Sequence, residues 1–261
     1  MTSRTLRLSD GGTVRVLEQG AGETLLLIHG VGLRAEAWEP QMALEAHVIA
    51  VDMPGHGESS PLPPGVRLPD YVAWAARVIE ALNLGPVNVA GHSMGSLIAA
   101  GLAISRPDLV SRVALLNAVH RRTPEARAAV LGRAAEIAAG AGSIEAPLAR
   151  WFTPDQAEIR GKVADWLRSV SQQGYAAAYR AFAEGDSVYA DRLGEIRCPA
   201  LVLTGDGDPN STPAMTRTMA GMVPHGQAVI IPGHRHMVNL TAPREVCQAL
   251  RDWLATREAH A

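Results

Sequence analysis

Short apolar runs alternate along most of the chain with stretches that have the spacing of amphipathic helices. Most of these runs are nearly continuous in apolar residues, as in a strand that is buried on both faces. The runs lie at residues 13–17, 24–28, 47–51, 87–90, 113–117, 200–204 and 228–231, and helices are predicted at 38–44, 71–82, 94–104 and 244–256. This α/β alternation predicts a mostly parallel central sheet flanked by helices on both faces.

The alternation stops between about residues 119 and 190, where no run has the character of a strand. This segment is rich in Ala, Arg and Glu, and helix-breaking residues interrupt it at 123–124, 140–142, Pro147, 153–154 and Gly174. We predict three or four helices inserted between two strands of the sheet. Residues 1–118 and 191–261 would then form one core, and 119–190 a helical insertion.

Bulk composition is that of an ordinary globular protein. The 261 residues suffice for one large domain, 47% of them are hydrophobic, and the formal net charge is −2. Arginines are scattered and balanced by acidic residues, so no nucleic-acid partner is expected. The start of the chain lacks the apolar segment of a signal peptide, and no run approaches the roughly 20 residues of a membrane helix. We therefore expect no membrane association and a cytoplasmic protein, monomeric or homodimeric. Cys198 and Cys247 are predicted to be free thiols.

The pentapeptide Gly91-His92-Ser93-Met94-Gly95 lies between a predicted strand and a predicted helix. A serine between two glycines at such a junction is typical of a nucleophile elbow, a tight turn that lifts the hydroxyl above the end of the strand. The alternative is an ordinary serine cap at the start of the helix. The strand before Ser93 and the helix after it favour the nucleophile.

An activated serine needs a base and an acid that orients the base. His236 follows the last predicted strand and precedes the last helix, with His234 as a competitor two residues earlier. Asp206 and Asp208 both follow the strand at 200–204, in a segment whose Gly and Pro are equally typical of a plain turn. A calcium loop starting at Asp206 is excluded, because its sixth and twelfth positions are Ser and Arg.

The reaction also needs donors for the developing oxyanion. The strand at 24–28 is followed by His29-Gly30-Val31-Gly32. We expect the backbone N–H groups of Val31 and of Met94, the residue after the nucleophile, to form this oxyanion hole.

Together these motifs resemble the α/β-hydrolase-fold serine hydrolases over nearly the whole chain. His29-Gly30 is similar to the family's oxyanion loop, residues 52–59 (Asp-Met-Pro-Gly-His-Gly-Glu-Ser) match its Asp-x-x-Gly-x-Gly-x-Ser turn, and residues 91–95 match its elbow. The candidate residues also follow the family order Ser, Asp, His.

The resemblance favours one residue from each pair of candidates for the acid and for the base. The family pattern Gly-x-x-Asp starts at Gly205 and places the acid at Asp208, and the family spacing of seven residues to a proline fits His236 and Pro243. The glycine that usually precedes the histidine is Arg235 here. Residues 119–190 resemble the family's helical cap. The resemblance is greatest to carboxylesterases, enol-lactonases and carbon–carbon bond hydrolases.

The implied activity is cleavage of a small-molecule carboxylic ester, lactone or amide through an acyl-enzyme intermediate, without a metal or an organic cofactor. A perhydrolase or a carbon–carbon bond hydrolase using the same triad is an alternative, and a non-catalytic ligand receptor is a further one. Candidate substrate contacts are Arg34 after the oxyanion loop, Trp151 within the cap, and three residues where the chain enters the cap, His120, Arg121 and Arg122. An arginine there would suit a substrate carboxylate, although arginines are also common as solvated surface residues.

Overall fold

The computed structural model describes residues 1–256. Its centre is an eight-stranded sheet in the order β1-β2-β4-β3-β5-β6-β7-β8, in which β1, β2 and β4 pair antiparallel and all other neighbours pair parallel. The strands are β1 (Thr2–Arg7), β2 (Thr13–Gln19), β3 (Thr24–Ile28), β4 (His47–Val51), β5 (Val87–His92), β6 (Val110–Leu116), β7 (Ala200–Gly205) and β8 (Gly226–Ile231).

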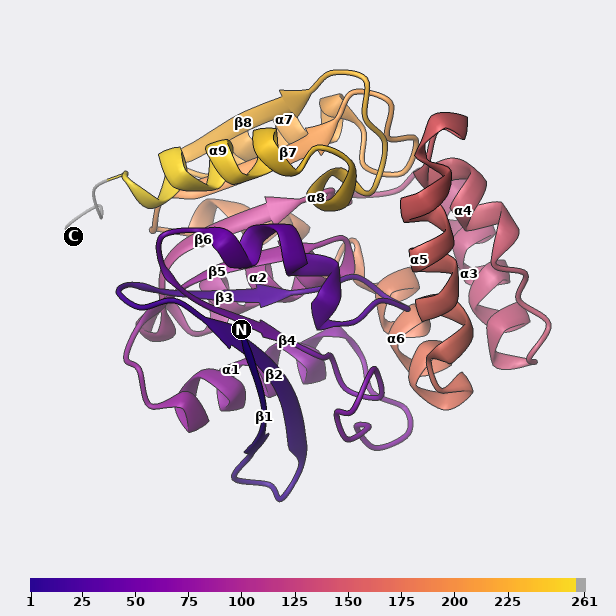
Figure 1. The fold of residues 1–261 in the computed structure, drawn as a ribbon. Helices are drawn as coiled ribbons and strands as arrows, with labels where there is room; N and C mark the ends of the chain where they lie inside the picture. Colours follow the sequence, from indigo (N-terminus) through magenta and orange to yellow (C-terminus); the bar gives the residue numbers. More distant parts are fainter. Residues whose placement is uncertain (257–261) are drawn as a thin grey trace.

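Helices cover both faces of the sheet (Figure 1). In the core they are α1 (Leu68–Leu82), α2 (Met94–Ser105), α7 (Pro213–Met222), α8 (Val238–Thr241) and α9 (Pro243–Leu254), with the 3₁₀ helices η1 (Ala35–Ala43), η2 (Pro107–Leu109) and η4 (Ala190–Glu195). One buried cluster joins the sheet to α1, α2 and α7, and a second joins it to η1, α8 and α9. The α/β-hydrolase fold predicted from the sequence is confirmed.

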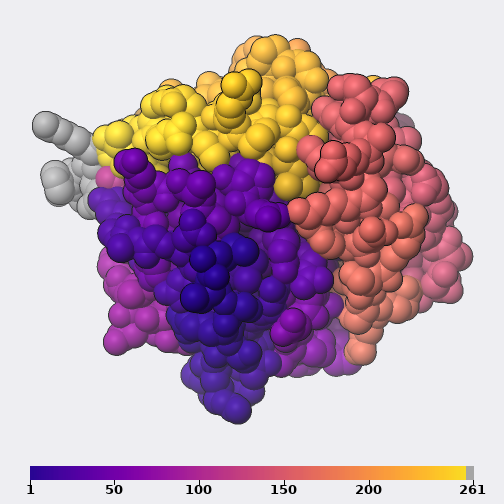
Figure 2. All heavy atoms as spheres, viewed as in Figure 1, coloured from indigo at the N-terminus to yellow at the C-terminus, as the bar shows by residue number. Residues whose placement is uncertain are grey.

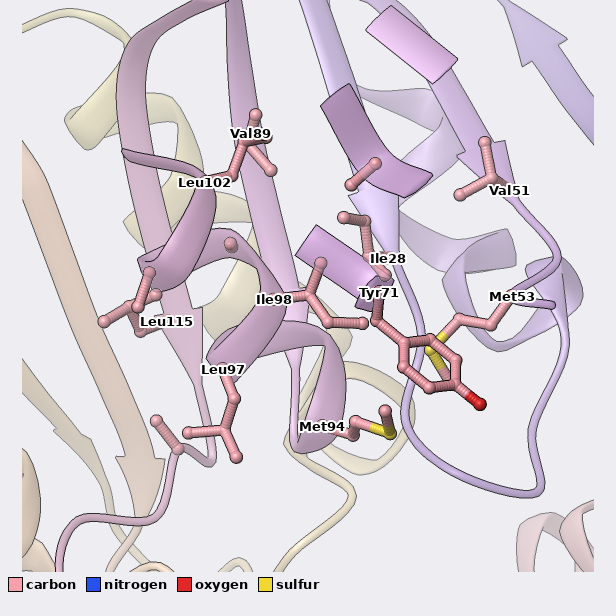
Figure 3. Close-up of a cluster of buried hydrophobic side chains, with 14 of the residues drawn as sticks. Ile28, Val51, Met53, Tyr71, Val89, Met94, Leu97, Ile98, Leu102 and Leu115 are labelled. Carbon is pink, nitrogen blue, oxygen red and sulfur yellow. The ribbon is translucent and has the colours of Figure 1, made fainter. Parts of the chain in front are cut away.

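The larger cluster forms around α2, which is apolar along almost its whole length. Figure 3 shows Met94, Ile98 and Leu102 from this helix among side chains of the sheet, including Ile28 and Val89. All five side chains are inaccessible to solvent. The helix that follows the elbow is therefore anchored by burial, and this fixes the position of Ser93 at its start.

Four α-helices lie between β6 and β7, in the segment where the sequence predicts three or four. They are α3 (Pro124–Ala138), α4 (Glu145–Trp151), α5 (Ala157–Ser169) and α6 (Gln172–Gly185), with the 3₁₀ helix η3 (Pro154–Gln156) between α4 and α5. We call α3 to α6, together with residues 119–123 that lead into α3, the cap. Figure 1 shows the cap on the side to which the arrowheads of β6 and β8 point, and Figure 2 shows it packed against the core as one block.

The strand order places the site. The neighbours β3 and β5 lie side by side, while β4 lies on the far side of β3, so the direction of the chain connections reverses between them. Open parallel sheets bind ligands at the carboxyl ends of the strands beside such a reversal. The loop after β3 and the elbow after β5 therefore meet under the cap.

Some elements differ from the sequence-based expectations. Strand β1 and helix α7 have no counterpart there, because β1 is mostly exposed and polar and α7 follows a Pro- and Gly-rich loop. Residues 35–43 form a 3₁₀ rather than an α-helix, with Pro40 inside it. Cys198 and Cys247 are free, as predicted, and both are partly buried.

Candidate active site

Ser93 occupies a sharp turn between β5 and α2. Its backbone has φ 54° and ψ −114°, a conformation that a non-glycine residue adopts only when its surroundings impose it. A side chain at Gly91 would collide with the Gly95 carbonyl group, and one at Gly95 would collide with the Ile28 carbonyl oxygen. The two flanking glycines are therefore required by close backbone approach, and the turn has the geometry of a nucleophile elbow.

The structure brings Ser93, His236 and Asp208 into one hydrogen-bonded chain. The Ser93 Oγ lies 3.1 Å from His236 Nε2, and His236 Nδ1 lies 2.7 Å from Asp208 Oδ2. All three residues are buried. A carboxylate at Nδ1 keeps the proton on that nitrogen, so Nε2 is left free to accept the hydroxyl proton of Ser93.

Asp208 is held by four donors. Its Oδ2 accepts from Asn117 Nδ2 at 2.9 Å as well as from the histidine, and its Oδ1 accepts from the backbone N–H groups of Asn210 and Ser211 at 2.8 and 3.1 Å. Burial alone would raise the pKa of Asp208, but the charge and hydrogen bond of His236, together with those of the other donors, hold it below its ordinary value. The acid is therefore ionised.

Asn117 is a site residue that sequence reasoning missed as such. It follows the end of β6 with φ 50°, its side chain also reaches Thr204 Oγ1 at 3.2 Å, and its carbonyl oxygen accepts from Ser211 Oγ at 2.6 Å. The only signal in the sequence is a polar amide directly after a buried strand. That residue type is also common in turns, so the sequence does not reveal its contact with Asp208.

The competing residues face elsewhere. His234 pairs through Nδ1 with Thr241 Oγ1 at 3.0 Å and does not line the cavity above Ser93. Asp206 accepts from the Gly233 N–H at 2.8 Å, which closes the turn before the histidine loop. The hydrogen bonds therefore favour His236 over His234 as the base, and Asp208 over Asp206 as the acid.

The loop after β3 passes beside Ser93. Gly30 and Val31 line the same cavity as the serine, and a side chain at Gly30 would press on the Ser93 Cβ. Met94 is the first residue of α2, where a backbone N–H has no acceptor within the helix. Of the two predicted oxyanion donors, Val31 thus lines the same cavity as Ser93, and Met94 follows Ser93 directly at the start of α2.

Two buried histidines fix the oxyanion loop. His29 Nε2 accepts from the Met53 N–H at 2.9 Å, and His56 Nε2 accepts from the Gly32 N–H at 3.0 Å. Burial lowers the pKa of His29 to about 4 and that of His56 to about 3, so both rings are neutral near pH 7. Each Nδ1–H then donates to a carbonyl oxygen, of Gly30 and Pro54 respectively. His56 lies in the Asp-x-x-Gly-x-Gly-x-Ser turn at 52–59, and its hydrogen bond to Gly32 ties that turn to the oxyanion loop.

A third neutral histidine supports the base. His92 Nε2 donates to the His236 carbonyl oxygen at 2.8 Å, and burial lowers the pKa of His92 to about 3. The residue before the nucleophile thereby holds the backbone of the residue that carries the base. The elbow and the histidine loop are thus tied directly to each other.

A cavity of about 790 Å³ lies between the core and the cap, with Ser93 and His236 in its floor. The cap wall carries three arginines, Arg122, Arg133 and Arg150, and one carboxylate, Glu136. The charges of all three arginines act on the Tyr179 hydroxyl, whose pKa is raised by burial and held down in part by these cations. The cavity is therefore suited to an anionic ligand.

Arg122 is the most deeply buried of these cations, with a side chain that is only 5% exposed. Its Nη1 lies 3.3 Å from Asp186, and its guanidinium group stacks over the Phe182 ring. Asp186 also binds Arg127 at 2.7 Å, so one carboxylate is shared by two guanidinium groups. Among the described residues the Arg122 Nη2 has no hydrogen-bond partner.

Of the substrate contacts predicted from the sequence, Arg122 and Trp151 line the cavity, whereas Arg34, His120 and Arg121 do not. Arg34 is paired with Glu36 at 2.7 Å, and Arg121 turns outward with φ 44° to pair with Asp191. His120 is half-buried near the start of η4. Trp151 does line the cavity, and its ring is stacked on that of His236 with centroids 5.7 Å apart.

The described part of the chain, residues 1–256, also bears on metal binding and on membrane insertion. Within this range, no group of three or more His, Cys, Asp or Glu side chains is arranged to hold a metal ion. None of the helices described there is both long and apolar enough to span a bilayer.

Comparisons with known proteins agree with the fold. The model of the alpha/beta hydrolase family matches residues 25–249. The chain is 54% identical to the (E)-2-((N-methylformamido)methylene)succinate hydrolase of Acinetobacter baylyi over 98% of this chain and 99% of that protein. It is 27% identical to the 2-(acetamidomethylene)succinate hydrolase of Mesorhizobium japonicum, over 93% and 91% of the two chains.

Among solved structures, an esterase from Thermogutta terrifontis superposes with a TM-score of 0.88 at 27% identity, covering 97% of this chain and 98% of that one. The family match spans most of the chain, and the Acinetobacter relative is similar along its whole length. The chain therefore belongs to the alpha/beta hydrolase family and is a hydrolase.

Proposed function

We propose that this hydrolase cleaves the amide C–N bond of an N-acylaminomethylene succinate, a small dicarboxylate, by two-step acyl transfer at Ser93. The observation that carries the proposal is the hydrogen-bonded chain from Ser93 to Asp208 at the floor of a cavity whose cap wall bears three arginines. The two relatives named above are hydrolases of amide-bearing succinates. The Thermogutta esterase structure is described as malate bound, and malate is also a dicarboxylate.

The geometry supports a defined order of proton transfers. His236 Nε2 accepts the Ser93 proton as Oγ attacks the amide carbonyl carbon, and the Val31 and Met94 amides bind the resulting oxyanion. The imidazolium then protonates the departing nitrogen as the C–N bond breaks. Water, deprotonated by the same ring, attacks the acyl-serine and releases a carboxylic acid. Asp208 stays ionised throughout and stabilises the imidazolium in both steps.

The cap supplies recognition in this proposal. A succinate carries two carboxylates, and a guanidinium group binds a carboxylate through paired hydrogen bonds. Arg122 offers an unpartnered Nη2 at the cavity wall, and it shares its counter-ion Asp186 with Arg127. We therefore assign one carboxylate of the substrate to Arg122. We assign the other to Arg150, because Arg133 already pairs with Glu136 and donates to the Ser143 carbonyl oxygen.

The test uses (E)-2-((N-methylformamido)methylene)succinate and its dimethyl ester, with formate release as the measurement. We expect turnover of the diacid, a kcat/KM at least about tenfold lower for the dimethyl ester, and no turnover by Ser93→Ala. A fluorophosphonate probe that labels Ser93 tests the nucleophile separately. If the probe labels Ser93 but no formate appears, the substrate class is wrong. If Ser93 is not labelled, the serine mechanism is wrong.

A further inference from the structure

Arg235 directly precedes His236, at the position where the resemblance to the family leads us to expect a glycine. Its side chain crosses from the core to the cap. The Nη1 donates to the Ala149 carbonyl oxygen at 2.9 Å and to the Phe152 carbonyl oxygen at 2.8 Å. These carbonyl groups belong to the last turn of α4 and the residue after it, where a helix leaves backbone acceptors unpaired.

The two acceptors flank Trp151 in the sequence, and Trp151 is the cap residue stacked on the base. The indole and imidazole planes are inclined by 27°, with centroids 5.7 Å apart. Arg235 precedes His236 directly, so one short stretch of backbone carries both the base and the side chain that holds the ring covering it. The His92 ring also lies next to His236, with ring centroids 5.1 Å apart and planes inclined by 58°.

We propose that Arg235 is a positioning residue that holds Trp151 against the ring of His236. The inference rests on the proposed function in so far as His236 is the base. An indole face stabilises a cation above it, and His236 becomes an imidazolium in both steps of acyl transfer. The stacked ring also restricts rotation of the imidazole and keeps water off its face. Arg235 contacts neither substrate nor reacting atoms and acts through Trp151.

The test compares Arg235→Met, Arg235→Lys, Trp151→Leu and the double variant Arg235→Met/Trp151→Leu. We expect Arg235→Met to lower kcat about three- to thirtyfold with little change in KM, and Arg235→Lys to restore part of the loss. Because Arg235 acts through Trp151, its removal should have no further effect in the Trp151→Leu background. Losses that multiply in the double variant would overturn the proposal.

Arg160, on α5, offers a matched control because it contacts the same cap helix, α4. It pairs with Glu145 at the start of α4 at 2.6 Å, so Arg160→Met loosens the far end of α4 without touching the carbonyl groups beside Trp151. We expect its kcat to stay within about twofold of the parent value. A loss equal to that of Arg235→Met would mean that any weakening of α4 suffices, and the specific role would fall.

A spectroscopic measurement separates this role from general stability and from the identity of the substrate. In histidine-labelled protein, the His236 ring protons should be displaced by the ring current of Trp151, with the resonance assigned through His236→Asn. We expect the parent position in Arg235→Lys and Arg160→Met, and the Trp151→Leu position in Arg235→Met. A folded Arg235→Met protein with an unmoved His236 resonance would refute the proposal, even if the substrate assignment were correct. If the resonance moves but formate is not released, only the substrate class fails.

Discussion

The core and cap walls of the cavity are built in opposite ways. On the core side, Asp208 accepts four hydrogen bonds, and the oxyanion loop is tied through neutral His29 and His56. On the cap side, Arg122 is almost fully buried yet keeps one nitrogen without a partner among the described residues. Groups that make and break bonds are thus fixed before a ligand arrives, whereas a group suited to recognition retains free donors.

The largest expected effect tests the core wall. Ser93→Ala removes the nucleophile without changing a packed side chain, so formate release should fall at least about 10⁴-fold while the thermal unfolding transition stays near that of the parent. The measurement is single-turnover formate release, with circular dichroism to check the fold. Asn117→Leu, which removes a donor from Asp208 but keeps the nucleophile, should give a smaller loss. A folded Ser93→Ala protein with substantial turnover contradicts the mechanism.

The second prediction concerns acid stability. Burial lowers the pKa of His29 to about 4 and those of His56 and His92 to about 3, against about 6.5 in an unfolded chain. The unfolded chain therefore binds these protons first as the pH falls. The stabilisation is complete above about pH 6.5 and is lost progressively towards pH 3. At pH 5 the loss reaches about 2 kcal/mol for each histidine.

Urea unfolding at pH 7, 6 and 5 measures this dependence. His56→Gln is the matched variant, because the glutamine Oε1 can still accept from the Gly32 N–H. We expect the pH dependence of its unfolding free energy to be weaker by about one proton. Equal slopes for the parent and His56→Gln would show that His56 is not held neutral in the folded protein.

The third prediction tests whether Arg122, on the cap side of the cavity, binds a carboxylate of the substrate. Arg122→Met should raise KM for the diacid about 10- to 100-fold, because a charge-assisted hydrogen bond at a buried site is lost, and should leave the KM of a neutral ester nearly unchanged. Arg127→Met is the control, since Arg127 shares Asp186 but does not line the cavity. Equal losses for the two variants, or equal effects on charged and neutral substrates, would remove Arg122 from substrate recognition.

The contrast between the core wall and the cap wall also explains which parts of the site could be predicted from the sequence. The elbow, the acid, the base and the oxyanion loop each follow a strand of the parallel sheet, so local motifs and strand order suffice to bring them together. Asn117 and His56 act through hydrogen bonds between loops that are distant in sequence. Neither an asparagine nor a histidine in a loop predicts which distant loop it will contact.

The substrate contacts were the least predictable part of the site. Arg34 and Arg121 lie close in sequence to the site, but Glu36 and Asp191 pair with them outside the cavity. Arg122 faces the cavity although Arg121 faces outward, and this difference depends on the backbone turn at Arg121 with φ 44°. Arg133 and Arg150 reach the cavity only because α3 and α4 pack over the carboxyl ends of the strands. Helical insertions carry no fixed register relative to the core, so sequence position alone could not assign these contacts.

The smallest expected effect tests the discrimination between neighbouring histidines. His234→Gln changes a ring that pairs with Thr241 and does not line the cavity, two residues from the proposed base. We expect kcat and KM for the diacid to stay within about twofold of the parent values, because neither the reacting atoms nor the bond between His236 and Asp208 is altered. His236→Gln, the same substitution two positions later, should abolish turnover. If His234→Gln were instead the variant that lost activity, the base would have been assigned to the wrong ring, and the hydrogen-bonded chain through Asp208 would not be the one used in catalysis.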